Sequence, residues 1–145
     1  GTAATADYYT VGSGKTDHAE SVKVLYDPSI ISYKTLLDVF FTVAHDPTEL
    51  NYQGPDRGTE YRSAVFYSNN EQKIATEAAI AQLEKEKVYS KPIVTEVTAL
   101  KAFYPAEEYH QDYMSLNPNS GYIQYWDAPK VEKLKKLYPN LIKEK

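Results

Sequence analysis

Alternating apolar and polar residues predict three short β-strands along the chain, at residues 22–26, 63–67 and 93–97. Asp, Asn or Pro residues bound each of them, and such residues are typical of strand ends. A three-stranded sheet is small for a chain of this length. The pattern therefore indicates either that further strands escape detection or that part of the sheet lies outside this sequence.

Apolar residues at helical spacing predict four helices between and after the strands. Ser32 is a typical N-cap for the first helix, which ends at residues 46–47, an Asp-Pro pair. Residues 69–70, both Asn, precede a second helix that runs to about residue 88. Pro105 and Pro129 begin the other two, because proline is favoured at the first helical position.

Two segments predict loops. Residues 1–17 are small, polar and rich in glycine, and residues 46–62 contain two prolines and two glycines. A loop as long as the second is usually functional or disordered. Strands that alternate with helices favour the α/β or the α+β class.

The amino-acid composition of the chain excludes several classes of function. A chain of 145 residues corresponds to one domain, and 16 basic against 20 acidic residues argue against a general binder of nucleic acid or membrane surfaces. No apolar run approaches the roughly 20 residues that span a bilayer. There is no cysteine, so these residues cannot form a disulfide, a thiolate metal site or a cysteine nucleophile. The 14 tyrosines can build aromatic walls that also donate hydrogen bonds.

The three histidines lie in three local polar clusters: residues 18–20, residues 45–46 and residues 109–113. His18 and Glu20 have the spacing of the H-x-E motif of zinc deaminases, but that motif needs cysteine partners that are absent here. No spacing selects for a metal site made from the three clusters. A phosphate-binding loop and a serine nucleophile elbow are also missing from the sequence.

Purely structural interpretations of these clusters stay open. Glu20 can be a solvated charge beside a strand, and His45 can complement the dipole at a helix C-terminus. Tyr109 and Tyr113, four positions apart, can form the half-buried face of one helix. The lysine-rich tail can be a solvated helix face. From the residues alone, the sequence indicates only a polar, Tyr-rich site on long loops that is compatible with acid catalysis.

Six collinear motifs extend this interpretation. They are Val-Gly-Ser-Gly-Lys-Thr-Asp-His-Ala-Glu at 11–20, Tyr-Asp-Pro-Ser at 26–29, His-Asp-Pro at 45–47, Gln-Gly-Pro-Asp-Arg-Gly-Thr-Glu-Tyr-Arg-Ser at 53–63, Pro-Ile-Val-Thr-Glu at 92–96 and Phe-Tyr-Pro-Ala-Glu-Glu-Tyr-His-Gln-Asp-Tyr at 103–113. In this order they resemble the A-type family of peptide methionine sulfoxide reductases.

The resemblance implies the activity and the fold. Members of this family reduce the S-epimer of methionine sulfoxide, free or in proteins, in the repair of oxidative damage. A cysteine thiolate attacks the sulfoxide sulfur, a glutamic acid protonates the sulfoxide oxygen, and a thiol regenerates the resulting sulfenic acid. The implied fold is a ferredoxin-like two-layer α+β sandwich, here without its first β-α-β segment.

The resemblance also assigns roles to residues. The proton donor corresponds to Glu20, and burial in a Tyr-lined pocket is expected to raise its pKa. Tyr8, Tyr61 and Asp56 join it as expected catalytic residues. The expected substrate-binding residues are Tyr113, His18 and Tyr109, and the resemblance gives supporting roles to His45, Arg62 and His110.

The chain departs from the family pattern in one major respect. The nucleophilic cysteine of the family lies in a Gly-Cys-Phe-Trp-Gly motif that these residues do not contain. We therefore expect that segment outside this sequence, and the alternative is a catalytically silent module that binds methionine sulfoxide or a partner protein. Asp17 and Glu60 stand where glycine and glutamine are usual, and Glu60 places an additional carboxylate beside Tyr61.

The remaining expectations concern the whole protein. We expect one domain over residues 1–145, of which 119–145 form a C-terminal tail with a short helix. No cofactor or metal is implied, and thioredoxin or another thiol is the expected reductant. We also expect a cytoplasmic protein that is a monomer when complete and binds neither nucleic acid nor membranes.

Overall fold

The structure is a computed structural model that describes residues 1–143. The chain divides into two compact units, Gly1–Pro105 and Ala106–Lys145, and each is described by itself. Helices and two small sheets occur together, one antiparallel and one parallel. This mixture confirms the expected α+β class. No helix among residues 1–143 is long and apolar enough to cross a membrane.

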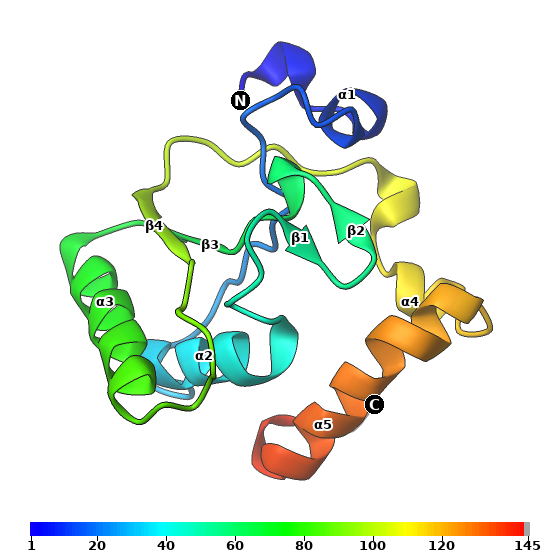
Figure 1. Cartoon of the computed structure of the whole chain (residues 1–145). Helices are drawn as coiled ribbons and strands as arrows, with labels where there is room; N and C mark the ends of the chain where they lie inside the picture. Colours follow the sequence, from blue (N-terminus) through cyan, green and yellow to red (C-terminus); the bar gives the residue numbers. More distant parts are fainter. Residues whose placement is uncertain (144–145) are drawn as a thin grey trace. The chain divides into compact units, whose positions relative to one another are not determined.

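The first unit contains a β-α-β element (Figure 1). Strand β3 (Ala64–Tyr67) pairs in parallel with β4 (Glu96–Ala99), and helix α3 (Asn70–Lys85) connects them. The Asn69 side chain accepts a 2.9 Å hydrogen bond from the Gln72 N–H. This bond satisfies one of the unpaired amides in the first turn of α3, so a local sequence signal fixes the start of the helix.

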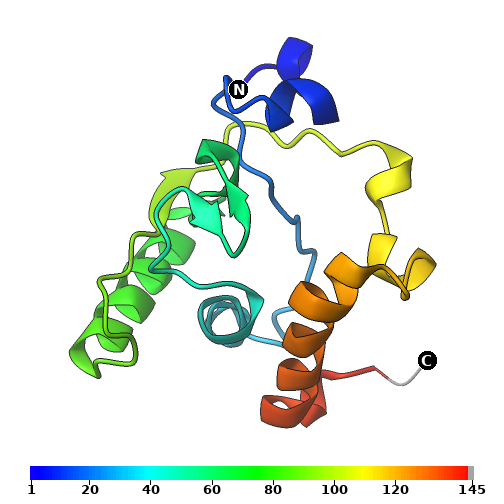
Figure 2. The same ribbon diagram turned by 45° about the vertical axis from the view of Figure 1, so that its right-hand side comes forward.

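Helix α2 (Tyr33–Val39) packs beside α3 and continues into a π-helical turn, Phe40–Ala44 (Figure 1). Figure 2 shows this helix nearly end-on. Its inward side chains supply most of the apolar core, through Leu37, Phe41 and Val43. The Tyr33 hydroxyl lies 3.0 Å from Oγ1 of the fully buried Thr76, which joins α2 to α3 by a hydrogen bond.

A short hairpin lies between the π-helical turn and β3. Its strands are β1 (Tyr52–Gln53) and β2 (Asp56–Arg57), and Gly54 at the turn has a φ of +56°. A 3₁₀ turn, Thr59–Tyr61, follows immediately. At the start of the unit, another 3₁₀ turn (Ala3–Thr5) precedes helix α1 (Tyr8–Gly12).

Within residues 106–143, the regular elements of the second unit are all helical. In chain order they are a 3₁₀ turn (Glu108–His110), α4 (Tyr113–Leu116), a π-helical turn (Ile123–Asp127), α5 (Ala128–Leu137) and a 3₁₀ turn (Pro139–Leu141). Pro129 lies in the first turn of α5, as expected. Ile123 is its one buried apolar side chain among the described residues.

Several predicted elements are confirmed and others are wrong. Strand 63–67, the helix after Asn69 and the last helix are present. The predicted loop at 1–17 contains α1, whose N-cap Asp7 accepts a hydrogen bond from the Thr10 N–H. The predicted loop at 46–62 contains the hairpin and a 3₁₀ turn. These elements are too short for a periodic pattern to reveal.

The predicted strand at 22–26 is wrong. Residues 21–27 run as an extended stretch with no ladder partner among residues 1–143 (Figure 2). Val22 is 88% exposed and Leu25 is 86% exposed. Alternation predicts an extended backbone, but a strand also requires a neighbour that accepts and donates its hydrogen bonds.

Two further predicted elements, the third strand and the helix from Pro105, need correction. The third strand begins at Glu96 instead of residue 93, because the Val94 N–H donates to the Pro47 carbonyl and not to a strand. The helix predicted from Pro105 is wrong, since only a 3₁₀ turn and the four-residue α4 form there. Asp112 has a φ of +55°, a left-handed conformation that a continuous α-helix cannot contain.

Candidate functional site

Residues 17–20 run alongside the turn that contains Tyr61. The Glu20 N–H donates a 2.8 Å hydrogen bond to the carbonyl of Glu60. The Arg62 guanidinium donates to the carbonyls of Asp17 and His18, each at 3.1 Å. One backbone hydrogen bond and two from the Arg62 side chain therefore hold the Glu20 segment against the residues on either side of Tyr61.

Tyr61 is the centre of a group of acidic and aromatic side chains. Burial raises the pKa of its hydroxyl to about 12, and the charges of Glu20, Asp56 and Glu60 and the nearby Tyr8 add to the increase. A negative charge on the phenolate would be repelled by these carboxylates, so the neutral, hydrogen-bond-donating form is favoured. The structure thus brings together the four residues expected to be catalytic, while their roles stay predictions.

The exposure of these side chains differs from the expectation for an enclosed acid. Tyr61 and Asp56 are half-buried, whereas Tyr8 is 49% exposed and Glu20 is also exposed. The expectation that Glu20 is buried in a Tyr-lined pocket is therefore wrong for the residues that the structure describes.

Glu60 is the buried acid of this site. It is only 3% exposed, and within residues 1–143 its Oε2 atom has no hydrogen-bond partner. Its carboxylate lies against Gly58, whose φ is +139°, and near Gly14. The sequence singled out Glu60 as a departure from the family pattern, but it gave no sign that this side chain is buried.

His18 ties the start of the chain to the Glu20 segment. Its Nε2 lies 3.0 Å from the Thr2 carbonyl oxygen and 3.1 Å from Oγ1 of Thr5. Its ring packs edge-on against Tyr104, with 5.6 Å between the centroids. These contacts are structural, and the substrate-binding role of His18 stays a prediction.

His45 belongs to a second hydrogen-bond network. Its Nδ1 donates to the carbonyl of Phe40, the first residue of the π-helical turn, at 3.0 Å. Its Nε2 lies 2.6 Å from Oγ of the buried Ser63, which in turn lies 2.7 Å from Oγ1 of Thr95. The network joins the helix end to the segments that precede β3 and β4.

The other two expected substrate-binding residues lie in the second unit. Tyr109 is in the 3₁₀ turn and Tyr113 begins α4, so they do not share one helix face. Tyr109 is 57% exposed and Tyr113 is 44% exposed. The ring of Tyr109 lies 4.0 Å from that of His110, and the Nε2 of His110 lies 3.6 Å from Oε2 of Glu107.

Residues 1–143 contain no group of three or more His, Asp or Glu side chains that could hold a metal ion.

Comparison with known proteins identifies the family. The family model for peptide methionine sulfoxide reductase matches residues 1–141. The chain belongs to this family. Peptide methionine sulfoxide reductase MsrA 2 of Mesorhizobium japonicum is 56% identical over 97% of the chain, and MsrA 2 of Synechocystis is 48% identical over 99%. The A-type resemblance is thereby confirmed.

Solved structures agree with this assignment. Reduced Mxr1 from Saccharomyces cerevisiae matches 78% of the chain with a TM-score of 0.73 and 39% identity. Methionine sulfoxide reductase A of Corynebacterium diphtheriae matches 77% with a TM-score of 0.63 and 32% identity. The chain spans 61% and 57% of those two proteins, and 72% and 67% of the two MsrA 2 relatives.

Proposed function

We propose that these residues form the acid and substrate side of an enzyme that reduces the S-epimer of methionine sulfoxide to methionine. The observation that carries the proposal is the gathering of Glu20, Asp56 and Tyr8 around Tyr61, in a chain of the peptide methionine sulfoxide reductase family. Acidic and phenolic donors suit this reaction, because a sulfoxide oxygen is a poor leaving group until it is protonated.

The proposed chemistry needs a thiolate from a cysteine that is not among these 145 residues. The thiolate sulfur bonds to the sulfoxide sulfur while Glu20 transfers its proton to the sulfoxide oxygen. The protonated oxygen then moves from the methionine sulfur to the cysteine sulfur: its bond to the methionine sulfur and the new S–S bond break, and a bond to the cysteine sulfur forms. Methionine leaves with the electron pair on its sulfur, and the cysteine becomes a sulfenic acid. Thioredoxin or another thiol is the proposed reductant of that sulfenic acid.

Tyr61 is proposed to donate a hydrogen bond to the same oxygen. Because its pKa is about 12, the hydroxyl keeps its proton throughout the neutral range. An uncharged donor of this kind stabilises developing negative charge on oxygen without itself needing a counter-ion. Bound substrate is proposed to cover the exposed Glu20, since removal of water from a carboxylate raises its pKa.

The alternative function is a catalytically silent module that binds methionine sulfoxide or a partner protein. The observation that favours it is the absence of cysteine from all 145 residues. The proposals of a single domain, of a cytoplasmic location and of a monomer rest on the sequence alone.

Single-turnover assays of the full-length protein test the proposal. The protein is mixed with the S- or the R-epimer of a methionine sulfoxide peptide, and the methionine formed is measured with time. We expect the S-epimer alone to react. Glu20→Gln should slow the reaction by about 100-fold or more, the usual contribution of a positioned acid, with little change in substrate affinity.

The matched control is Glu77→Gln, which makes the same chemical change at an exposed position of α3. It should leave the rate unchanged. An equal rate in the Glu20→Gln variant would remove the proposed role of Glu20. Binding of the S-epimer without methionine formation by the unmodified protein would establish the silent module instead.

A further inference from the structure

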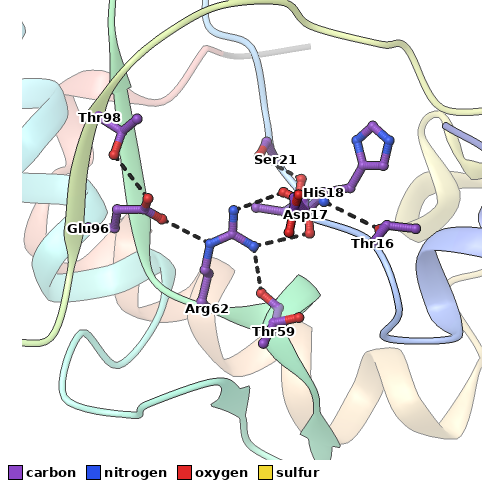
Figure 3. A network of polar contacts seen from close by, with 9 residues as sticks. Thr16, Asp17, His18, Ser21, Thr59, Arg62, Glu96 and Thr98 are labelled. Carbon is purple, nitrogen blue, oxygen red and sulfur yellow. Dashed lines mark hydrogen bonds and ion pairs between the residues drawn. The ribbon is translucent and has the colours of Figure 1, made fainter. Parts of the chain in front are cut away.

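The Arg62 side chain lies at the centre of a set of contacts that we call the Arg62 clamp (Figure 3). Its Nη1 donates to the carbonyls of His18 at 3.1 Å and Thr59 at 2.9 Å, and its Nη2 donates to the carbonyl of Asp17 at 3.1 Å. Its Nε donates to Oε2 of Glu96 at 2.9 Å. Four acceptors from three separate segments thus converge on one guanidinium.

Glu96 fixes the orientation of the guanidinium. It is the first residue of β4, so its backbone is held by the parallel ladder. Its other carboxylate oxygen accepts a 3.0 Å hydrogen bond from the Thr98 hydroxyl, as Figure 3 shows. The hydrogen bond from Arg62 lowers the pKa of the Glu96 carboxyl, so the carboxylate stays charged as a partner of Arg62.

The clamp acts on the segment that carries Glu20. Arg62 holds the carbonyls of Asp17 and His18, and the Glu20 N–H is bound to the carbonyl of Glu60. The two holding residues, Glu60 and Arg62, are the sequence neighbours of Tyr61. The Arg62 head group therefore links residues 17–18 directly to the turn that contains Tyr61.

We propose that Arg62 is a positioning residue for the reduction, because its guanidinium fixes the Glu20 segment against the turn of Tyr61, with Glu96 as the orienting partner. The inference rests on the proposed function. It concerns how Glu20 is placed and adds no group that touches the substrate.

Lysine cannot replace arginine in this arrangement. The guanidinium presents five N–H donors in a rigid planar fork, whereas a lysine ammonium is a compact point charge on a flexible stem. A single ammonium cannot reach three carbonyls and a carboxylate with the same geometry. Misplacement of a reacting group by about 1 Å can cost about 100-fold in rate.

The first test measures single-turnover reduction of the S-sulfoxide peptide by the full-length protein. Arg62→Lys should lower the rate constant by about 10- to 100-fold. The amplitude of the reaction reports the fraction of active protein. Both the amplitude and the KM should stay near those of the parent. Glu96→Gln keeps an oxygen acceptor and should lose less rate than Glu96→Ala. A change in amplitude alone would show that Arg62 serves only stability.

The control is Asp38→Asn, which removes an exposed ion pair between Lys34 and Asp38 that is 3.3 Å long and far along the chain from the clamp. It should leave rate and amplitude unchanged. The inference also predicts that Arg62→Lys loses its effect in a Glu20→Gln background, because both changes act through one carboxyl. The same fold-loss in both backgrounds would overturn it.

A second readout does not depend on activity. Hydrogen exchange of the Glu20 amide should be faster in Arg62→Lys than in the parent and unchanged in Asp38→Asn, because loss of the clamp frees the segment. Unchanged exchange in Arg62→Lys would overturn the inference. If the unmodified protein forms no methionine, the proposed function fails, and amide exchange still decides whether Arg62 holds the segment.

Discussion

Replacement of Gly58 by alanine tests the most constrained position of the candidate site. Gly58 has φ +139° and ψ 162°, a region that only glycine adopts without strain. A Cβ atom there would also lie 2.6 Å from Cδ of the buried Glu60 carboxyl. The substitution therefore forces either a change of backbone conformation or a displacement of Glu60.

The expected loss of folding free energy has two causes, the backbone strain at Gly58 and the contact with Glu60. Holding a non-glycine residue in this region costs about 1–3 kcal/mol of folding free energy, a factor of about 5 to 150 in the folding equilibrium. The contact with Glu60 adds to that cost. Gly58→Ala combined with Glu60→Ala removes the contact but keeps the backbone strain, so it should recover part of the loss and no more.

Urea denaturation of the full-length protein measures both effects, and Gly12→Ala is the control. Gly12 is the last residue of α1, and a Cβ atom there would meet nothing within 4 Å. Alanine at that position should be neutral or stabilise by up to about 1 kcal/mol. A Gly58→Ala protein within about 0.5 kcal/mol of the parent, the range of an ordinary surface change, would refute the reasoning.

Two further predictions concern Tyr61 and the start of α3. Because folding raises the pKa of Tyr61 from 10.0 to about 12, its contribution to stability is complete below pH 10 and is lost as the pH rises toward 12. The measurement is a pH titration of tyrosinate absorbance in the parent and in Tyr61→Phe, and the difference between the two curves reports Tyr61. Its midpoint should lie near pH 12, and a midpoint near pH 10 would contradict the burial of this hydroxyl. Asn69→Ala should lower the unfolding free energy by about 0.5–2 kcal/mol in urea denaturation, because it removes the cap of α3, whereas Asn69→Asp should retain most of it.

The elements that the sequence predicts correctly have local causes. The starts of α2 and α3 follow from Ser32 and Asn69, which accept hydrogen bonds from amides three residues later. The parallel strand β3 follows from alternation over residues 63–67. Residues 22–26 show the limit of this reasoning, because an extended stretch becomes a strand only when a distant segment pairs with it.

In the candidate site too, the sequence predicts some features and misses those that depend on contacts between distant segments. The motifs of the family indicate Glu20, Asp56 and Tyr61. The charges of Glu20 and Asp56 act on Tyr61 in the structure, while the roles of these residues stay predictions. The Arg62 clamp could not be predicted, because Arg62 meets the Asp17 carbonyl across 45 positions and Glu96 across 34. The burial of Glu60 depends on how Gly14 and Gly58 approach it, which no single-sequence pattern encodes.

The extended stretch at residues 21–27 has a consequence for handling the protein. Within residues 1–143 this stretch has no ladder partner, and its exposed Val22, Val24 and Leu25 make it a template onto which a second chain could add a strand. Lys23 is the one charge among residues 22–26, and it lies over the ring of Phe103 at 5.7 Å from the centroid. The charge of Lys23 interrupts this apolar segment and thereby opposes aggregation. Neutral apolar substitutions of Lys23 should therefore be avoided in variants of the protein.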